Sequence, residues 1–193
     1  WPIEEREVPA SIVPGEVLSP TQPHVTWPEP YSMQGISEDD LVDFTPELKA
    51  QALEVMDKYV MGGLFNPPIH ADNPMGKYAA MNCPGGGGGA NINAPPVADP
   101  VTNIFYVAEH TGCFALRLIP GEKADLFFPN TTGVTTAQYA NGVPSSSARK
   151  PRHPSGLPIW KPPYSTITAY DMNTGEKKFI IPTGQTPQRY KDI

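Results

Sequence analysis

Residues 164–181 read YSTITAYDMNTGEKKFII and carry the clearest secondary-structure signal in the chain. Polar and apolar side chains alternate through Tyr164–Asp171, as they do along a half-buried β-strand. The next residues, 173–176, have turn composition, and a second strand is predicted from Lys177 to Ile181. A strand, an Asp-x-x-Thr-Gly turn and a second strand form the kind of hairpin that builds β-propeller blades. The full pattern occurs once, so no internal repeat can be measured.

The strongest helix signal lies between residues 45 and 63. Thr45 is a typical N-cap residue, and Pro46 suits the first helical position. A Gly-Gly pair at 62–63 is typical of a helix end. The sequence therefore predicts a helix over about 46–60. Its apolar face consists of Leu48, Ala52, Val55, Met56 and Tyr59.

Two shorter elements are predicted on either side. Ser37 begins a short helix, and the acidic residues at 39 and 40 are explained by the preference of a helix start for negative charge rather than by a metal or acid–base site. The β-branched and aromatic residues of Ile104–Ala108 predict a strand. Glu109 and His110 follow this strand, where substrate-facing loops of propellers often start. A long proline-rich loop is expected from there to Tyr164.

The N-terminal residues 1–31 are interrupted by frequent X-Pro pairs, each of which disfavours the α region for its first residue. We expect extended chain that crosses a surface, without a helix and with hardly any ladder strand. The whole chain is interpreted as one region with three parts. These are an extended Pro-rich segment (1–36), a helical insertion (37–63), and blade strands with long loops (64–193).

The composition indicates an ordered chain rich in loops. Of 193 residues, 25 are proline, 39% are hydrophobic and 18% are charged, so long regular elements are disfavoured while a core remains available. The net charge of −6 argues against nucleic acid as a partner, because phosphate binding needs clustered Lys and Arg. No apolar run approaches the roughly 20 residues of a membrane span.

The cysteines, histidines and basic residues do not form a recognisable metal or catalytic motif. Cys83 and Cys113 are too few for a Cys₄ zinc site, and the sequence leaves their pairing open. The four histidines, His24, His70, His110 and His153, are scattered and are expected to be structural or solvent-facing. The basic cluster at 149–153 is interpreted as a solvated loop.

Five glycines, Gly85–Gly89, run into Ala90 and Asn91. They fit a dinucleotide fingerprint formally, but that motif must open a helix. Pro84 and the prolines at 95 and 96 exclude a helix there. A phosphate loop is excluded as well, because no Gly-Lys-Ser/Thr ends the run. What remains is either close approach of bare backbone to a ligand or a flexible surface loop.

The turn at 171–175 resembles a known motif. Quinoprotein dehydrogenases, eight-bladed propellers that use pyrroloquinoline quinone (PQQ), carry a docking pattern Ala-x-Asp-x-x-Thr-Gly-x-x-x-Trp in their blades. Ala169, Asp171, Thr174 and Gly175 match this pattern, and Phe179 replaces the Trp. Trp1 resembles the end of a preceding docking motif.

Three longer stretches resemble the membrane-type glucose dehydrogenase branch of that family. They are FTPELKAQALEVMDKYVMGGLFNPP (44–68), GGGGANINAPPVADPVTNIFYVA (86–108) and GLPIWKPPYSTITAYDMNTGE (156–176). The resemblance covers nearly the whole chain in the right order. It implies a mainly β fold, part of an eight-bladed propeller covering about two blades, with long Pro-rich loops and one inserted α-helix.

The resemblance also implies which site residues are present. Asn91 matches an Asn that offers its amide to the quinone, and Ile92 replaces the usual Trp, so both are candidate cofactor-binding residues. The catalytic Asp, a neighbouring Lys and the calcium ligands are expected upstream, on other blades of the same propeller. No catalytic or metal-binding residue is therefore assigned within this chain.

The function implied is part of a PQQ- and calcium-dependent dehydrogenase. Such an enzyme would oxidise a hydroxyl of a sugar, polyol or alcohol and pass electrons to a quinone or cytochrome. It would be periplasmic, with any membrane anchor outside this chain. The alternative is a non-catalytic β-propeller module for binding or assembly, which the replacements at Phe179 and Ile92 favour.

Overall fold

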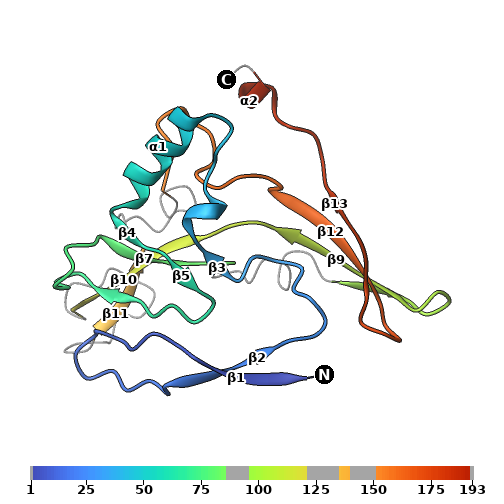
Figure 1. Cartoon of the computed structure of the whole chain (residues 1–193), viewed down its shortest axis with the longest axis horizontal. Coiled ribbons are helices and arrows are strands. Elements are labelled where there is room, and N and C mark those ends of the chain that lie inside the picture. The colour runs from blue at the N-terminus through green and yellow to red at the C-terminus, as the bar shows by residue number, and fades with distance from the viewer. Residues whose placement is uncertain (1, 86–95, 121–134, 140–150, 192–193) are drawn as a thin grey trace.

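The computed structural model describes residues 2–85, 96–120, 135–139 and 151–191 (Figure 1). It is mainly β, as expected, with one longer helix. The elements, in chain order, are β1 (Ile3–Glu7), β2 (Thr21–Val25), β3 (Gly35–Ile36), the 3-10 helix η1 (Glu38–Asp40), α1 (Pro46–Met56), β4 (Tyr59–Val60), β5 (Gly62–Gly63), β6 (Ile69–His70), β7 (Ala79–Asn82), β8 (Val97–Asp99), β9 (Ile104–His110), β10 (Phe114–Pro120), β11 (Thr135–Tyr139), β12 (Ser165–Asp171), β13 (Lys177–Pro182) and α2 (Gln188–Lys191).

One sheet has the architecture of a propeller blade. Its four strands lie in the order β13-β12-β9-β8, and every neighbouring pair is antiparallel. The predicted hairpin is confirmed as β12 and β13, with Ala169 opposite Phe179. Its turn is closed by the Gly175 N–H, which donates to the Asp171 carbonyl at 2.7 Å. The strand predicted at 104–108 is confirmed as β9 and extends to His110.

The second sheet lies beneath α1 and mixes strand directions. It has the order β11-β10-β7-β4, with β6 parallel to β10. Ala52 and Met56 of α1 are fully buried and pack into a core with Met81 of β7 and Trp160. Apolar burial of this helix face stabilises the contact between the helix and the sheet.

The start of α1 is confirmed, but its predicted end is wrong. The Leu48 N–H donates to Thr45 Oγ1 at 3.2 Å, as expected for an N-cap. The helix ends at Met56 rather than near residue 60. Tyr59 instead pairs in parallel with Ala79 of β7, so sheet pairing competes successfully with the last helical turn.

The expectation of hardly any ladder strand at the N-terminus is wrong. Residues 1–31 contain the antiparallel hairpin β1–β2, in which Pro23 lies opposite Glu5. This hairpin is a two-stranded sheet. Each of its strands has one free edge, so a proline without an N–H can be accommodated there.

The long loop expected between Glu109 and Tyr164 is also interrupted by structure. It contains β10 and β11, which pair with each other. Pro120 ends the β10 ladder rather than preventing it, since a proline is tolerated at a strand end or sheet edge. The proline content therefore limits the length of these strands without excluding them.

Cys83 and Cys113 form a disulfide, which resolves the pairing that the sequence left open. Both are buried in the main core. The bridge joins the chain just after β7 to the chain just before β10. Next to it, Gly85 has φ +85°, and a Cβ there would lie 2.8 Å from the Gly112 carbonyl oxygen. This first residue of the glycine run therefore needs to be glycine.

A strap, residues Trp27–Met33, crosses the blade without regular structure, as the sequence predicts for this surface-crossing segment. Hydrogen bonds and one ion pair with the blade hairpin hold it in place. The contacts are Trp27 Nε1–H to the Thr174 carbonyl (2.8 Å), Tyr170 Oη–H to the Glu29 carbonyl (2.6 Å), and Lys177 Nζ to the Pro30 carbonyl (3.1 Å) and to Glu29 Oε2 (3.1 Å). Among the described residues, no helix combines the length and apolarity needed to cross a bilayer.

Candidate functional site

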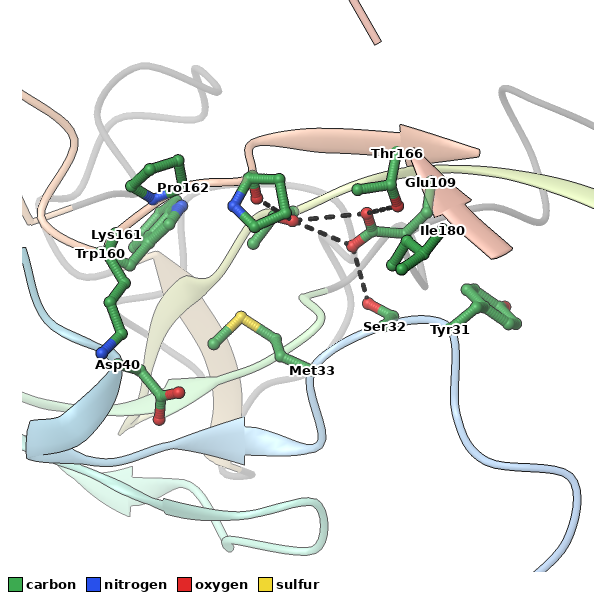
Figure 2. A pocket seen from close by; sticks show the side chains of 12 residues that line it. Tyr31, Ser32, Met33, Asp40, Glu109, Trp160, Lys161, Pro162, Thr166 and Ile180 are labelled. Atoms are coloured by element: carbon green, nitrogen blue, oxygen red, sulfur yellow. Dashed lines mark hydrogen bonds between the residues drawn. The ribbon is translucent and has the colours of Figure 1, made fainter. Parts of the chain in front are cut away.

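A cleft of about 220 Å³ lies where the strap meets one end of the blade (Figure 2). Most of its wall comes from three places, and Asp40 of η1 lines it as well. The strap contributes residues 31–33, the blade contributes Glu109 of β9 and Thr166 of β12, and the segment before β12 contributes residues 160–163. The cleft thus forms where segments far apart in the sequence converge.

Glu109 is the central polar group of this cleft. Its side chain is only 3% exposed, because the alternation along β9 places it on the same inward face as Val107. Three hydroxyl groups approach its carboxylate. They are Ser32 Oγ at 2.9 Å from Oε1, Thr111 Oγ1 at 3.2 and 3.3 Å from the two oxygens, and Thr166 Oγ1 at 3.4 Å from Oε2. Thr166 is also the cross-strand partner of Glu109 in the ladder.

The hydroxyls satisfy the carboxylate only in part. A carboxylate offers about four acceptor sites, and each hydroxyl has one proton to donate. Thr111 Oγ1 also lies 3.0 Å from the Pro163 carbonyl oxygen, which competes for its proton. In the described part of the chain, no ion pair reaches Glu109. Because the four acceptor sites outnumber the three hydroxyl protons, acceptor capacity remains on the Glu109 carboxylate.

A second carboxylate and an apolar wall complete the site. Asp40 accepts hydrogen bonds from the N–H and Oγ–H of Ser37 at 2.7 and 2.8 Å, so the predicted helix-start role is confirmed, and it also lines the cleft. The Nζ of Lys161 lies 3.4 Å from Oδ2 of Asp43. Trp160 is 5% exposed and supplies apolar surface together with Met33. Figure 2 shows Met33 lying between Asp40 and Ser32, so the carboxylates of Asp40 and Glu109 lie at different ends of the cleft with apolar surface between them.

The predicted cofactor-binding residues Asn91 and Ile92 lie outside the described residues. The cleft brings the carboxylates of Asp40 and Glu109 together with the ammonium group of Lys161, a mixed set of charges that does not single out a cofactor carrying carboxylates. Within the described residues, no group of three His, Cys, Asp or Glu side chains could hold a metal ion. We therefore derive no cofactor step from the groups in this cleft.

The sequence pointed to part of this site. It indicated Glu109 and His110 at a strand end, and Glu109 is in the cleft while His110 is exposed. Ser32, Thr111 and Thr166 were not predicted, because nothing local relates them. One sequence signal could have identified the site: the carboxylate of Glu109 lies on the inward face of β9, two residues after the buried Val107.

Of the basic cluster at 149–153, residues 149 and 150 lie outside the described residues, and the remaining part is only partly a solvated loop. Arg152 is exposed, but Pro151 is buried and His153 is 2% exposed. The His153 Nε2 lies 3.0 Å from the Leu48 carbonyl of α1, and Nδ1 accepts from the Ser155 N–H at 3.1 Å. This contact was not predictable from the proline-rich sequence around His153. It gives His153 a structural role, which is one of the two roles expected for the histidines.

Comparison with known proteins agrees with this architecture. Residues 1–192 match the family model of the PQQ glucose/ethanol/alcohol dehydrogenase β-propeller domain. Similar proteins include the quinate/shikimate dehydrogenase (quinone) of Acinetobacter baylyi, with 25% identity over 93% of this chain and 22% of that protein. No solved structure matches the chain.

Two glycerol dehydrogenase large subunits are also similar. The protein of Gluconobacter thailandicus is 28% identical over 91% of this chain and 25% of its own length. That of Gluconobacter oxydans is 26% identical over 91% of this chain and 24% of its own length. The chain thus spans about a quarter of the length of the relatives it matches. Because residues 1–192 match the family model and the chain contains a four-stranded blade, this chain belongs to the PQQ-dependent glucose/ethanol/alcohol dehydrogenase family and forms part of its β-propeller domain.

Proposed function

We propose that this chain is part of a PQQ-dependent dehydrogenase that oxidises a hydroxyl of a sugar, polyol or alcohol and passes the electrons to a quinone or cytochrome. The observation that carries the proposal is the family match over residues 1–192. The named activities of the relatives support a hydroxylated small molecule as substrate, since they concern glycerol and quinate or shikimate.

The blade also supports the presence of further blades in the same protein. Its outer strand β13 exposes Phe179, Ile180 and Ile181 at 43%, 47% and 48%, and Val97 of β8 is 63% exposed. Adjacent apolar residues at both edges of one sheet would be covered in a closed ring of blades. Those blades would carry the catalytic Asp and the calcium ligands.

A periplasmic location is part of the proposal. The Cys83–Cys113 disulfide supports it, because structural disulfides persist mainly in oxidising compartments. When bound, PQQ would accept the electrons of the oxidised hydroxyl. The residues described here would form the wall of a substrate-facing cleft, and Asn91 remains a predicted contact of the cofactor.

The test uses the full-length protein. Purified protein is reconstituted with PQQ and Ca²⁺, and dye reduction is measured with glycerol, quinate, D-glucose and ethanol. We expect PQQ-dependent reduction with at least one of them and quinone absorbance that is retained after gel filtration. No reduction and no retained absorbance would instead indicate the non-catalytic propeller module. Release of the protein by osmotic shock of intact cells tests the periplasmic location.

A further inference from the structure

The strap is attached less firmly than the other walls of the Glu109 cleft. In those walls the backbone is fixed: β9 and β12 are joined by their ladder, and the Lys161 N–H donates to the Asp40 carbonyl at 2.9 Å. Among the described residues, no backbone–backbone hydrogen bond involves a residue of the strap. Pro28 and Pro30 lack an N–H, so the strap has few donors with which it could pair as a strand.

Side chains therefore carry the attachment of the strap. The Lys177 Nζ reaches two groups of the strap, the Pro30 carbonyl oxygen and Glu29 Oε2, each at 3.1 Å. At the cleft, Figure 2 shows Ser32 reaching from the strap to the Glu109 carboxylate, to which its hydroxyl donates at 2.9 Å. These contacts can break and form again without disturbing either sheet.

Both ends of the strap are anchored, whereas its middle only rests on the blade. β2, which precedes the strap, pairs with β1, and β3, which follows it, pairs with β5. In between, Tyr31 packs against Val107 and Tyr170 of the blade. The middle of the strap can therefore leave the blade while both ends stay in their sheets, as in a lid that moves about two hinges.

The blade face next to Tyr31 contains a polar group without a partner. Thr168 is the ladder partner of Val107 and lies on the same strand face as Tyr170. It is fully buried, and its Oγ1 has no hydrogen-bond partner in the described part of the chain. A buried hydroxyl without a partner is unfavourable. Opening of the strap would admit water to this face, so the closed form gives up one interaction that the open form regains.

We propose that the strap opens and closes as a lid over the Glu109 cleft, and that the ammonium group of Lys177 is the latch that keeps it closed. The latch is sensitive to salt, because the side chains of Lys177 and Glu29 are 23% and 66% exposed and their ion pair is open to screening. The inference concerns access to the cleft and goes beyond the proposed function, since it holds whichever ligand the cleft takes.

The test is native-state cleavage of the full-length protein by chymotrypsin after Tyr31, followed by mass spectrometry. A protease needs the strap to leave the blade, so the cleavage rate follows the open population when opening and closing are fast. Lys177→Met keeps the apolar stem and should accelerate this cleavage about tenfold, because it removes a hydrogen bond from a charged donor together with an ion pair. Lys177→Arg should restore the wild-type rate to within about twofold.

A matched control and a salt series separate the latch from a general effect of charge. Lys178, the next residue, pairs with Glu176 inside the hairpin, so Lys178→Met should leave the rate unchanged. Raising KCl from about 0.02 to about 0.5 M should accelerate cleavage of the wild type severalfold and leave Lys177→Met unaffected. A peptide substrate in the same buffers corrects for the effect of salt on the protease itself.

Two further variants connect the latch to the cleft and allow for poor folding of Lys177→Met. Glu29→Gln removes the ion pair from the strap side and should accelerate cleavage about threefold. Ser32→Ala removes the bond to Glu109 and should also accelerate it severalfold, because that bond belongs to the same closure. Cleavage after Phe105, inside β9, reports unfolding of the blade and should stay at the wild-type rate in both variants.

The outcomes decide the inference without reference to turnover. An unchanged rate in Lys177→Met and Glu29→Gln would overturn the latch. Acceleration after Phe105 in step with that after Tyr31 would show unfolding of the blade instead of a lid, and would overturn the inference as well. Dye reduction by the wild type is a separate measurement, so the proposed function stands or falls independently of these rates.

Discussion

Replacing both bridged cysteines by alanine should loosen the sheet that holds β7 and β10. The bridge joins residues separated by 30 positions, and the chain-entropy relation for a loop of that length gives about 3.6 kcal/mol. Without the bridge, the opening of this region should become easier by up to that amount. Exchange of the protected amides should then accelerate by roughly 400-fold.

Hydrogen exchange followed by mass spectrometry on the full-length protein measures this locally. The informative peptides contain Ala80–Asn82 and Phe114–Leu116, which pair across β7 and β10. Peptides from β12 and β13 belong to the other sheet and are distant from the bridge along the chain, so they should change less. Ala115→Gly, a buried truncation that keeps the bridge, should cost about 1 kcal/mol and sets the scale of a packing loss. If amide exchange in the double variant stays within threefold of the wild-type rate, the loop-entropy account is wrong. Two free thiols in a non-reducing peptide map of the wild-type protein would contradict the pairing itself.

Two further outcomes follow from individual residues. Gly85→Ala should destabilise the protein by about 1–3 kcal/mol in thermal unfolding, because it combines φ +85° with a Cβ 2.8 Å from the Gly112 carbonyl oxygen. Gly15→Ala is the control: its φ is +83° but the space around it is open, so it should cost less in the same assay. Burial, reinforced by the negative charge of Glu29, raises the pKa of Tyr170 to about 12. The folded state then holds this proton more tightly, so the contribution of Tyr170 to stability is retained below pH 10 and falls from pH 10 to 12. In an ultraviolet titration, Tyr170→Phe should lack the phenol that ionises near pH 12. A titration curve equal to that of the wild type would contradict the assignment.

Local signals sufficed where one short stretch determines the structure. The start of α1 follows from the side chain of Thr45 and the fixed φ of Pro46. The β12–β13 hairpin follows from its alternation and from the Gly175 turn. In both places the residues that interact are neighbours in the chain, so the sequence shows them together.

Longer-range partners were not predictable in the same way. Tyr59 leaves the helix because Ala79 is available as a strand partner, and Pro23 is accepted in a strand because its hairpin has a free edge. The cleft shows the same limit, since Ser32 and Glu109 are separated by 77 positions. Only the folded strap brings that hydroxyl to the carboxylate.

The two sides of the cleft are built in different ways. Glu109 and Thr166 belong to the ladder between β9 and β12, whereas residues 31–33 and 160–163 belong to segments outside the ladder. Exchanges in those outer segments would therefore reshape the opening without breaking a single rung of the sheet. Apart from a change at Ser32, which bonds to Glu109, such exchanges would alter the groups around the carboxylate while the ladder keeps its backbone position.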